Sequence, residues 1–151
     1  MSNPIKVILT CDARYLNPLR VIVLSLLKTA NPTRGLVIYI AHDQAFEDEG
    51  CREAITTLCA HYPFSSAVFL NTTHLLDRHR DLLASEHNVW APIIWAGPLL
   101  TDVLPSDVCG RIIYLDVDML VCHRLDELFD LDLKGMLAAA AFENDRGRSA
   151  Y

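Results

Sequence analysis

The segment Arg111–Val121 constrains the fold of this chain more than any other. It reads Arg-Ile-Ile-Tyr-Leu-Asp-Val-Asp-Met-Leu-Val, a short apolar run that ends by presenting two carboxylates. A run rich in Ile, Val and Tyr, with a Cys-Gly turn before it, is typical of a buried strand in a parallel sheet. Because side chains alternate along a strand, Asp116 and Asp118 are expected to point the same way, about 6–7 Å apart along the backbone.

Two ionised carboxylates beside each other in a packed sheet need compensation. A divalent cation with oxygen ligands supplies it, and open α/β sheets bind ligands at the carboxyl ends of their strands. The alternative interpretation is structural: one aspartate caps the following helix and the other is solvated. The Asp-x-Asp spacing by itself does not separate the two interpretations.

Composition narrows the class of protein. With 151 residues, of which 52% are hydrophobic and 21% charged, the chain is expected to form a single domain over 1–151 with a sizeable core. The net charge of −6 argues against nucleic acid as a partner. No apolar run is long enough to span a bilayer, and the first residues are not typical of a secretory leader. Five cysteines, without a Cys-x-x-Cys pair, indicate reduced thiols and a cytoplasmic location.

The first half of the chain alternates between strand and helix patterns. Apolar runs predict strands, and residues at helical spacing between turn signals predict helices. The order strand-helix-strand-helix-strand predicts an α/β, Rossmann-like, mostly parallel sheet flanked by helices. The expected strands are 5–11, 36–41 and 67–70, and the expected helices are 19–29 and 48–59.

The second half is less regular. A helical segment is expected at 75–83, and a second one at 90–104 is interrupted by Pro92 and Pro98. The central strand 111–116 and a single helical turn at 124–129 follow. The segment 136–142 has helix-forming residues, but its flanking residues suit a strand. Neither an internal repeat nor a linker divides the chain.

Several of these pieces recur together in one known family. They are Val7–Asp12 followed by Tyr15, a helix carrying Ser25-Leu26, the segment Tyr114–Val121, and Leu125–Leu133. Their order and spacing resemble the family 8 glycosyltransferases, a group that includes glycogenin and bacterial lipooligosaccharide galactosyltransferases. The resemblance covers the N-terminal half of the family's catalytic domain, so the chain looks truncated relative to the family.

The resemblance implies a GT-A-like fold and a metal-dependent reaction. Family members use Mn²⁺ (or Mg²⁺) to hold the diphosphate of a UDP-sugar, and they transfer the sugar to a carbohydrate or glycolipid acceptor with retention. A divalent ion stabilises the charge that develops on the UDP leaving group. By position, Asp116 and Asp118 match the family's metal ligands, and Asp116 also lies near the ribose.

The resemblance places the nucleotide at the end of the first strand. Asp12 matches the carboxylate near the uracil ring and Tyr15 the aromatic ring that stacks on it, while Thr10 and Cys11 offer backbone groups. Each side chain also has a structural interpretation, because Asp12 suits a helix cap and Tyr15 suits packing at a helix entry. The resemblance identifies no catalytic residue in this chain.

The chain departs from the family pattern in two respects. Gly97 stands where the family carries an arginine that faces the donor phosphates, a charge-assisted contact worth about 1.5–3 kcal/mol. The residues considered as replacements are Arg14, Arg78, Arg80 and Arg111. The family's later half, which supplies a histidine ligand and acceptor contacts, has no counterpart here, and His123 lies at the wrong place to replace that histidine. A homo-oligomer or a partner that supplies the missing half is one expectation that follows.

The sequence is also compatible with two further functional classes. A haloacid-dehalogenase-type phosphatase also has a strand that ends in Asp-x-Asp, but Met119 and Leu120 do not suit its motif. A catalytically incomplete module that binds nucleotide, or serves only as a structural remnant, is the nearer alternative. The remaining histidines show no ligand spacing and are interpreted as loop or surface residues: His42, His61, His74, His79 and His87.

Overall fold

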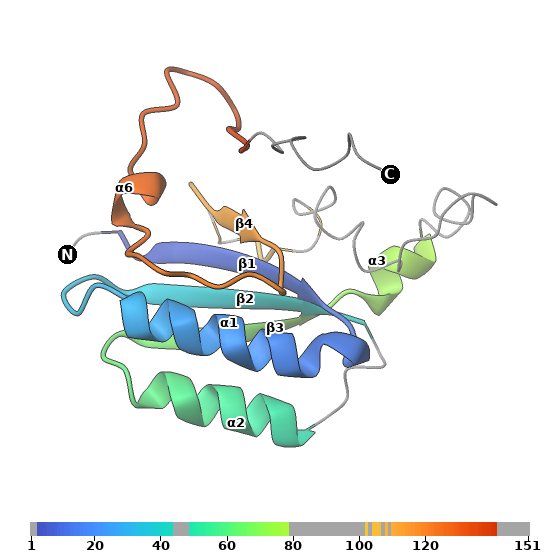
Figure 1. Cartoon of the computed structure of the whole chain (residues 1–151). Coiled ribbons are helices and arrows are strands. Elements are labelled where there is room, and N and C mark those ends of the chain that lie inside the picture. Colours follow the sequence, from blue (N-terminus) through green and yellow to red (C-terminus); the bar gives the residue numbers. More distant parts are fainter. Residues whose placement is uncertain are drawn as a thin grey trace, which may run out of the picture.

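A parallel β-sheet forms the centre of the protein (Figure 1). The computed structural model describes residues 3–43, 49–78, 102, 104–106, 108 and 110–141. Within them the sheet has the order β3-β2-β1-β4, and every pair of neighbouring strands is parallel. Its strands are β1 (Ile5–Cys11), β2 (Leu36–His42), β3 (Ser65–Asn71) and β4 (Ile113–Leu115). The expected α/β architecture is confirmed.

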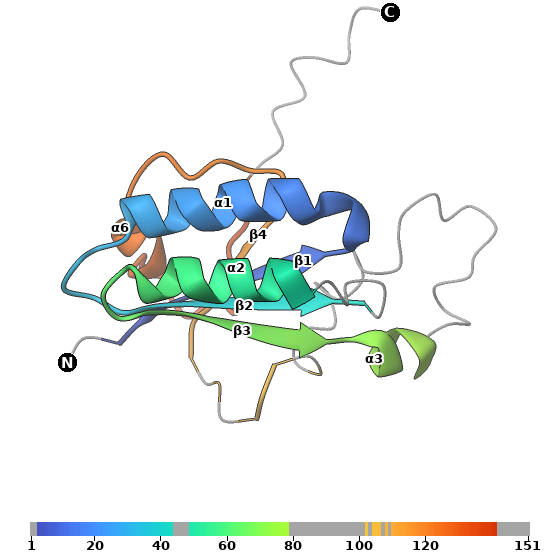
Figure 2. The same ribbon diagram turned by 90° about the horizontal axis from the view of Figure 1, so that it is seen from below.

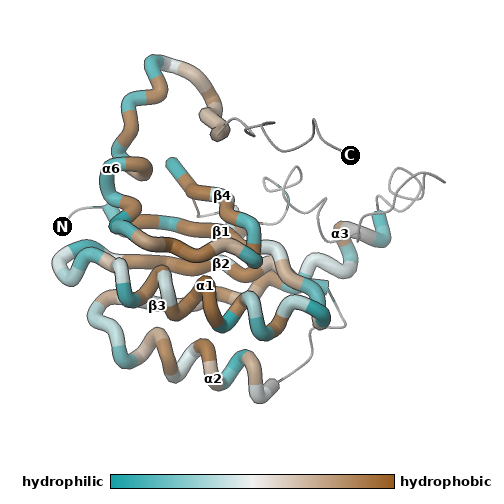
Figure 3. The backbone as a smooth tube through the Cα atoms, in the orientation of Figure 1, coloured by the Kyte–Doolittle hydropathy of each residue, from teal (hydrophilic) through white to brown (hydrophobic). Residues whose placement is uncertain are grey.

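Helices α1 (Leu16–Thr29) and α2 (Glu49–Ala60) pack on one face of the sheet (Figure 2). Alternate residues of β1 and β2, such as Val7, Leu9 and Ile38, are fully buried beneath the helices. The opposite face carries a smaller cluster around Ile8, which is covered in part by Leu104, Val108 and Ile112. Because the helices cover one face and further residues cover part of the other, the two strands are apolar along nearly their whole length, as Figure 3 shows.

The first elements begin and end close to their expected positions. Helix α1 begins at Leu16 rather than at residue 19, because Pro18 falls in the first turn, where an amide proton has no helical partner. A 3₁₀ turn, η1 (Ala13–Tyr15), connects it to β1. Strand β3 covers Ser65–Asn71, so it is longer than the apolar core from which it was predicted.

The second half differs more from expectation. Helix α3 (Thr73–Arg78) contains the start of the segment expected at 75–83, and α6 (Asp126–Phe129) confirms the helical turn expected near 124–129. Residues 136–141 form neither helix nor strand. Most of the helix expected at 90–104 lies outside the described residues.

Strand β4 is shorter and less enclosed than the sequence indicated. It has three residues rather than the six expected over 111–116, and within the described residues it pairs with β1 alone. The strand ends because the chain turns: the Met119 amide donates to the Asp116 carbonyl at 3.3 Å. The expectation of a central strand that reaches the aspartates is therefore wrong for the described part of the chain.

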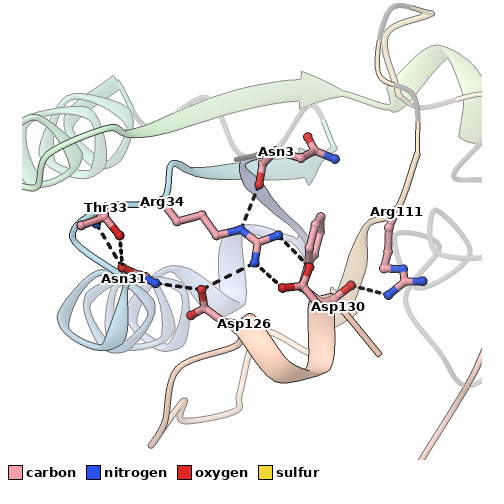
Figure 4. A network of polar contacts seen from close by, with 8 residues as sticks. Asn3, Asn31, Thr33, Arg34, Arg111, Asp126 and Asp130 are labelled. Atoms are coloured by element: carbon pink, nitrogen blue, oxygen red, sulfur yellow. Dashed lines mark hydrogen bonds and ion pairs between the residues drawn. The ribbon is translucent and has the colours of Figure 1, made fainter. Parts of the chain in front are cut away.

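An ion-pair network fixes α6 at the amino end of the sheet, opposite the strand ends that carry the aspartates (Figure 4). The Arg34 guanidinium donates to both carboxylate oxygens of Asp130 at 2.7 and 2.9 Å, and lies 5.0 Å from the centre of the Phe129 ring. Asn31 donates to Asp126 at 3.0 Å. Among the described residues, no helix is both long and apolar enough to cross a membrane.

Candidate nucleotide and metal site

The sheet has a topological switch point between the neighbouring strands β1 and β4. Strands β2 and β3 lie in succession on one side of β1, and β4 lies on the other side. The crevice outside the carboxyl ends of strands at such a switch point is where α/β sheets bind ligands. Pairing between β1 and β4 ends at Leu9 and Leu115, so β1 extends beyond the ladder through Thr10 and Cys11. These strand ends bring together the two segments that the sequence singled out.

Asp116 and Asp118 lie in the turn that follows β4. Both are exposed, whereas Val117 between them is 8% exposed and belongs to the core. The expected strand geometry of this pair is wrong, because the residues form a turn, but the buried valine still leaves both carboxylates on the solvent side. No ion pair joins either carboxylate to a lysine or arginine in the described ranges.

Tyr114 connects the aspartate turn to β1. Its hydroxyl lies 3.3 Å from the Thr10 hydroxyl, across the paired strands. Burial raises the pKa of Tyr114, the hydrogen bond with Thr10 lowers it, and the charge of Asp116 raises it further. The phenol therefore keeps its proton at neutral pH, close to the first aspartate of the pair. Thr10 is expected to offer its backbone groups to the nucleotide, and its side-chain hydroxyl contacts Tyr114.

Asp12 caps the turn that leads into α1. Its carboxylate accepts from the Arg14 amide at 2.9 Å and from the Arg14 guanidinium at 2.7 and 3.1 Å. Asp12 is only 7% exposed, while the Arg14 side chain is 70% exposed. The structural interpretation of Asp12 as a cap is thus confirmed. A carboxylate has further lone pairs, so the cap does not prevent contact with a ligand.

Tyr15 and Cys11 differ sharply in exposure. Tyr15 is 40% exposed beside Asp12, so its ring is accessible. Cys11 is 1% exposed, and burial, followed by the charge of Asp12, raises the pKa of its thiol to about 12. The thiol donates to the Asp12 carbonyl at 3.2 Å. Cys11 is therefore protonated and unsuited to bind a metal, which leaves its backbone as the group available to a ligand.

The donor set fits a hard cation that shares its coordination with a ligand. Within the described segments, no three His, Cys, Asp or Glu side chains are grouped closely enough to enclose a metal. Mg²⁺ is usually bound through one or two carboxylates together with phosphate oxygens of the substrate. Oxygen ligands also suit Mn²⁺. Two accessible carboxylates in one turn match that pattern.

The structure separates the arginines considered as replacements for the one missing at Gly97. Arg111 precedes β4 and donates to the carbonyls of Phe129 and Leu131, so it lies at the wrong end of the strand. Arg78 is exposed at the end of α3. Arg14 lies at the carboxyl end of β1 beside Asp12. Arg80 and Gly97 lie outside the described residues.

His42 was wrongly interpreted as a loop or surface residue. It is the last residue of β2, completely buried, and paired in register with Cys11. Arg52 lies 2.8 Å from Nε2, and the Asp43 carbonyl lies 2.9 Å from Nδ1. Because arginine can only donate, Nε2 is the acceptor and Nδ1 carries the proton. The sequence offered one signal, because His42 directly continues an apolar strand.

The other described histidines agree with the interpretation from the sequence. His61, His74 and His123 are exposed. His79 and His87 lie outside the described residues. No histidine in the described ranges is grouped with Asp116 and Asp118.

Comparisons with known proteins agree with the resemblance. A protein-family model described as "Glycosyl transferase family 8" matches residues 6–150. The curated protein "Probable galacturonosyltransferase-like 4" of Arabidopsis thaliana is 26% identical over 139 residues. That match covers 92% of this chain and 38% of the relative, so the chain spans well under half the relative's length.

Solved structures show the same fold. The apo structure of the bifunctional glycosyltransferase WbbM matches 88% of this chain and 22% of its own, with a TM-score of 0.67 at 14% identity. The apo form of mouse xyloside xylosyltransferase 1 matches 85% of this chain and 47% of its own, with a TM-score of 0.57 at 19% identity. The strand arrangement is therefore that of GT-A-type glycosyltransferases.

Proposed function

The chain belongs to glycosyl transferase family 8, and from that premise we propose that it forms the donor-binding part of a retaining, metal-dependent hexosyltransferase that uses a UDP-sugar. Membership of the family decides against the phosphatase alternative. The observation that carries the finer proposal is the pair of exposed carboxylates, Asp116 and Asp118, at the switch point of the sheet.

Each residue of the site has a proposed task. Asp116 and Asp118 would hold Mn²⁺ or Mg²⁺, which when bound neutralises the charge that develops on the departing diphosphate. Tyr15 would stack on the uracil ring, and Asp12 would accept a hydrogen bond from it while capping η1. The backbone of Thr10 and Cys11, beyond the β4 ladder, would contact the nucleotide.

Among the described arginines, Arg14 is the best placed to replace the arginine that the family carries at the position of Gly97. Arg14 is a largely exposed cation at the same strand end as Asp12. We propose that its guanidinium contributes positive charge near the donor phosphates while it remains paired with Asp12. Arg111 is excluded from this role by its contacts at the amino end of β4.

A nucleotide-binding module without turnover is the second candidate. It is favoured by the lack of a third protein donor beside the aspartates in the described segments. A partner chain that supplies further ligands would then complete the site. Both candidates require metal-dependent binding of UDP; turnover of a UDP-sugar separates them.

Calorimetric titration of UDP with and without Mn²⁺ tests the shared requirement. We expect binding that depends on Mn²⁺, and its loss in Asp116→Ala and in Asp118→Ala with thermal unfolding unchanged, because both side chains are exposed. Glu127→Ala is the matched control, since it removes an exposed carboxylate from α6. Binding by either aspartate variant at the level of the unsubstituted protein would contradict the assignment.

A further inference from the structure

We propose that Ser25 is a positioning residue that holds the aspartate turn of the donor site against helix α1. The proposal rests on the proposed function, because it assigns Ser25 a role in the binding of the metal and UDP. Ser25 lies in α1, far from both aspartates in the sequence, and does not itself contact the proposed ligands.

The contact is a hydrogen bond between a buried hydroxyl and a backbone amide. Ser25 is 8% exposed, and its hydroxyl donates to the Ile22 carbonyl at 2.8 Å. The same oxygen accepts from the Val121 amide at 3.1 Å. Since the proton of the hydroxyl is directed to Ile22, its lone pairs are available to Val121.

Ser25 lies in the core, where a polar side chain destabilises the fold unless it forms hydrogen bonds. Its helix neighbours Ile22 and Leu26 are buried in the core beneath α1. A buried hydroxyl without an acceptor or donor partner destabilises a fold, and an alanine would fill the same place without that penalty. The Ile22 carbonyl already accepts the proton of this hydroxyl, so what serine adds over alanine is an acceptor for the Val121 amide.

The aspartate turn has few other attachments. One backbone hydrogen bond, from Met119 to Asp116, closes the turn, the side chain of Val117 anchors it in the core, and Tyr114 of β4 interacts with Asp116. Met119 and Leu120, which follow Asp118, are 46% and 64% exposed. The Ser25–Val121 bond is thus the first polar attachment of the chain after Asp118 in the described residues.

The bond also connects the two halves of the site. Helix α1 follows directly from η1, which carries Tyr15 and is capped by Asp12. Val121 follows the turn that carries Asp116 and Asp118. Ser25 therefore fixes the metal-binding segment relative to the nucleotide-binding segment, in addition to the pairing of β1 with β4.

The test compares Ser25→Ala with Thr29→Ala in the full chain. Thr29 is a matched control, because its hydroxyl bonds to α1 carbonyls at 2.8 and 3.3 Å and leaves the turn untouched. Ser25→Ala is expected to speed amide exchange of Val121 and weaken Mn²⁺ binding in the presence of UDP, each about five- to tenfold. Ser25→Thr keeps the hydroxyl and is expected to restore both values.

Each result of this test has one meaning. Unchanged Val121 exchange in Ser25→Ala overturns the contact, and faster exchange with unchanged Mn²⁺ affinity overturns the positioning role. If the unsubstituted chain binds no Mn²⁺–UDP, the proposed function fails and the role of Ser25 with it, whereas the exchange data still report the contact. Should Ser25→Ala not fold, Ser25→Cys keeps the packing with a weaker acceptor and is expected to show smaller changes of the same sign.

Discussion

Single residues at the carboxyl ends of the strands have structural roles that are compatible with the functions proposed for them. Asp12 caps η1 and remains able to accept from a nucleotide, so the two interpretations of that residue are compatible. The burial of His42 could not be predicted from its neighbours in the sequence alone. Its burial depends on Arg52 and Phe69, which reach it from α2 and β3, and neither contact follows from its neighbours in the sequence.

The contacts of His42 predict a large effect on stability. His42→Ala removes a completely buried ring from hydrogen bonds with Arg52 and the Asp43 carbonyl. We expect a loss of about 2–3 kcal/mol in the free energy of unfolding, measured by urea denaturation. His61→Ala is the control, because His61 is exposed and its loss should cost under about 0.5 kcal/mol. Equal effects in the two variants would refute this view of His42.

At the scale of elements, local sequence patterns predict whether a helix or strand is present better than they predict its length. The regular apolar runs of β1 and β2 were found almost to the residue, because their pattern and their burial coincide. Strand β4 was predicted too long, because the apolar run continues into a turn whose Val117 is buried. The contacts of Arg111 could not be predicted either, because it donates to the backbone carbonyls of Phe129 and Leu131, which lie far from it in the sequence.

Helix α6 is too short to be stable by itself, and its attachment should depend on pH. Arg34 lowers the pKa of Asp130 through their hydrogen bonds. A carboxylate whose pKa is lower in the folded state stabilises that state above its unfolded pKa, about 4, and loses the effect as pH falls through the folded value. We therefore expect amide protection of Phe129 and Asp130 to decrease in acid.

Substitution of the carboxylate isolates its contribution to this pH dependence. Asp130→Asn should show lower protection near neutral pH and a weaker acid dependence, after correction for intrinsic exchange. Asp132→Asn is the matched control, because Asp132 accepts from the Lys134 amide, whereas Arg34 donates to Asp130. An acid dependence that is the same in Asp130→Asn and in the unsubstituted chain would show that another group controls the docking of α6.

At the scale of the whole molecule, the strand order creates the candidate site. The alternation of strands and helices predicted a parallel sheet, and the position of β4 on the far side of β1 places Asp116 and Asp118 near the end of the strand that leads to Asp12. The sequence indicated both halves of the site through the family pattern. It did not indicate Ser25 as their connection, because that contact joins residues 96 apart.

A divalent ion and UDP are expected to bind together at the carboxyl ends of β1 and β4. Paramagnetic broadening of amide NMR signals by Mn²⁺, titrated with UDP into the isotope-labelled chain, locates that position directly. We expect the signals of Thr10–Asp12 and Asp116–Asp118 to broaden first, while those of Arg34 and Phe129 at the opposite end of the sheet remain sharp. Broadening centred on Asp126 and Asp130, or none that requires UDP, would contradict the account.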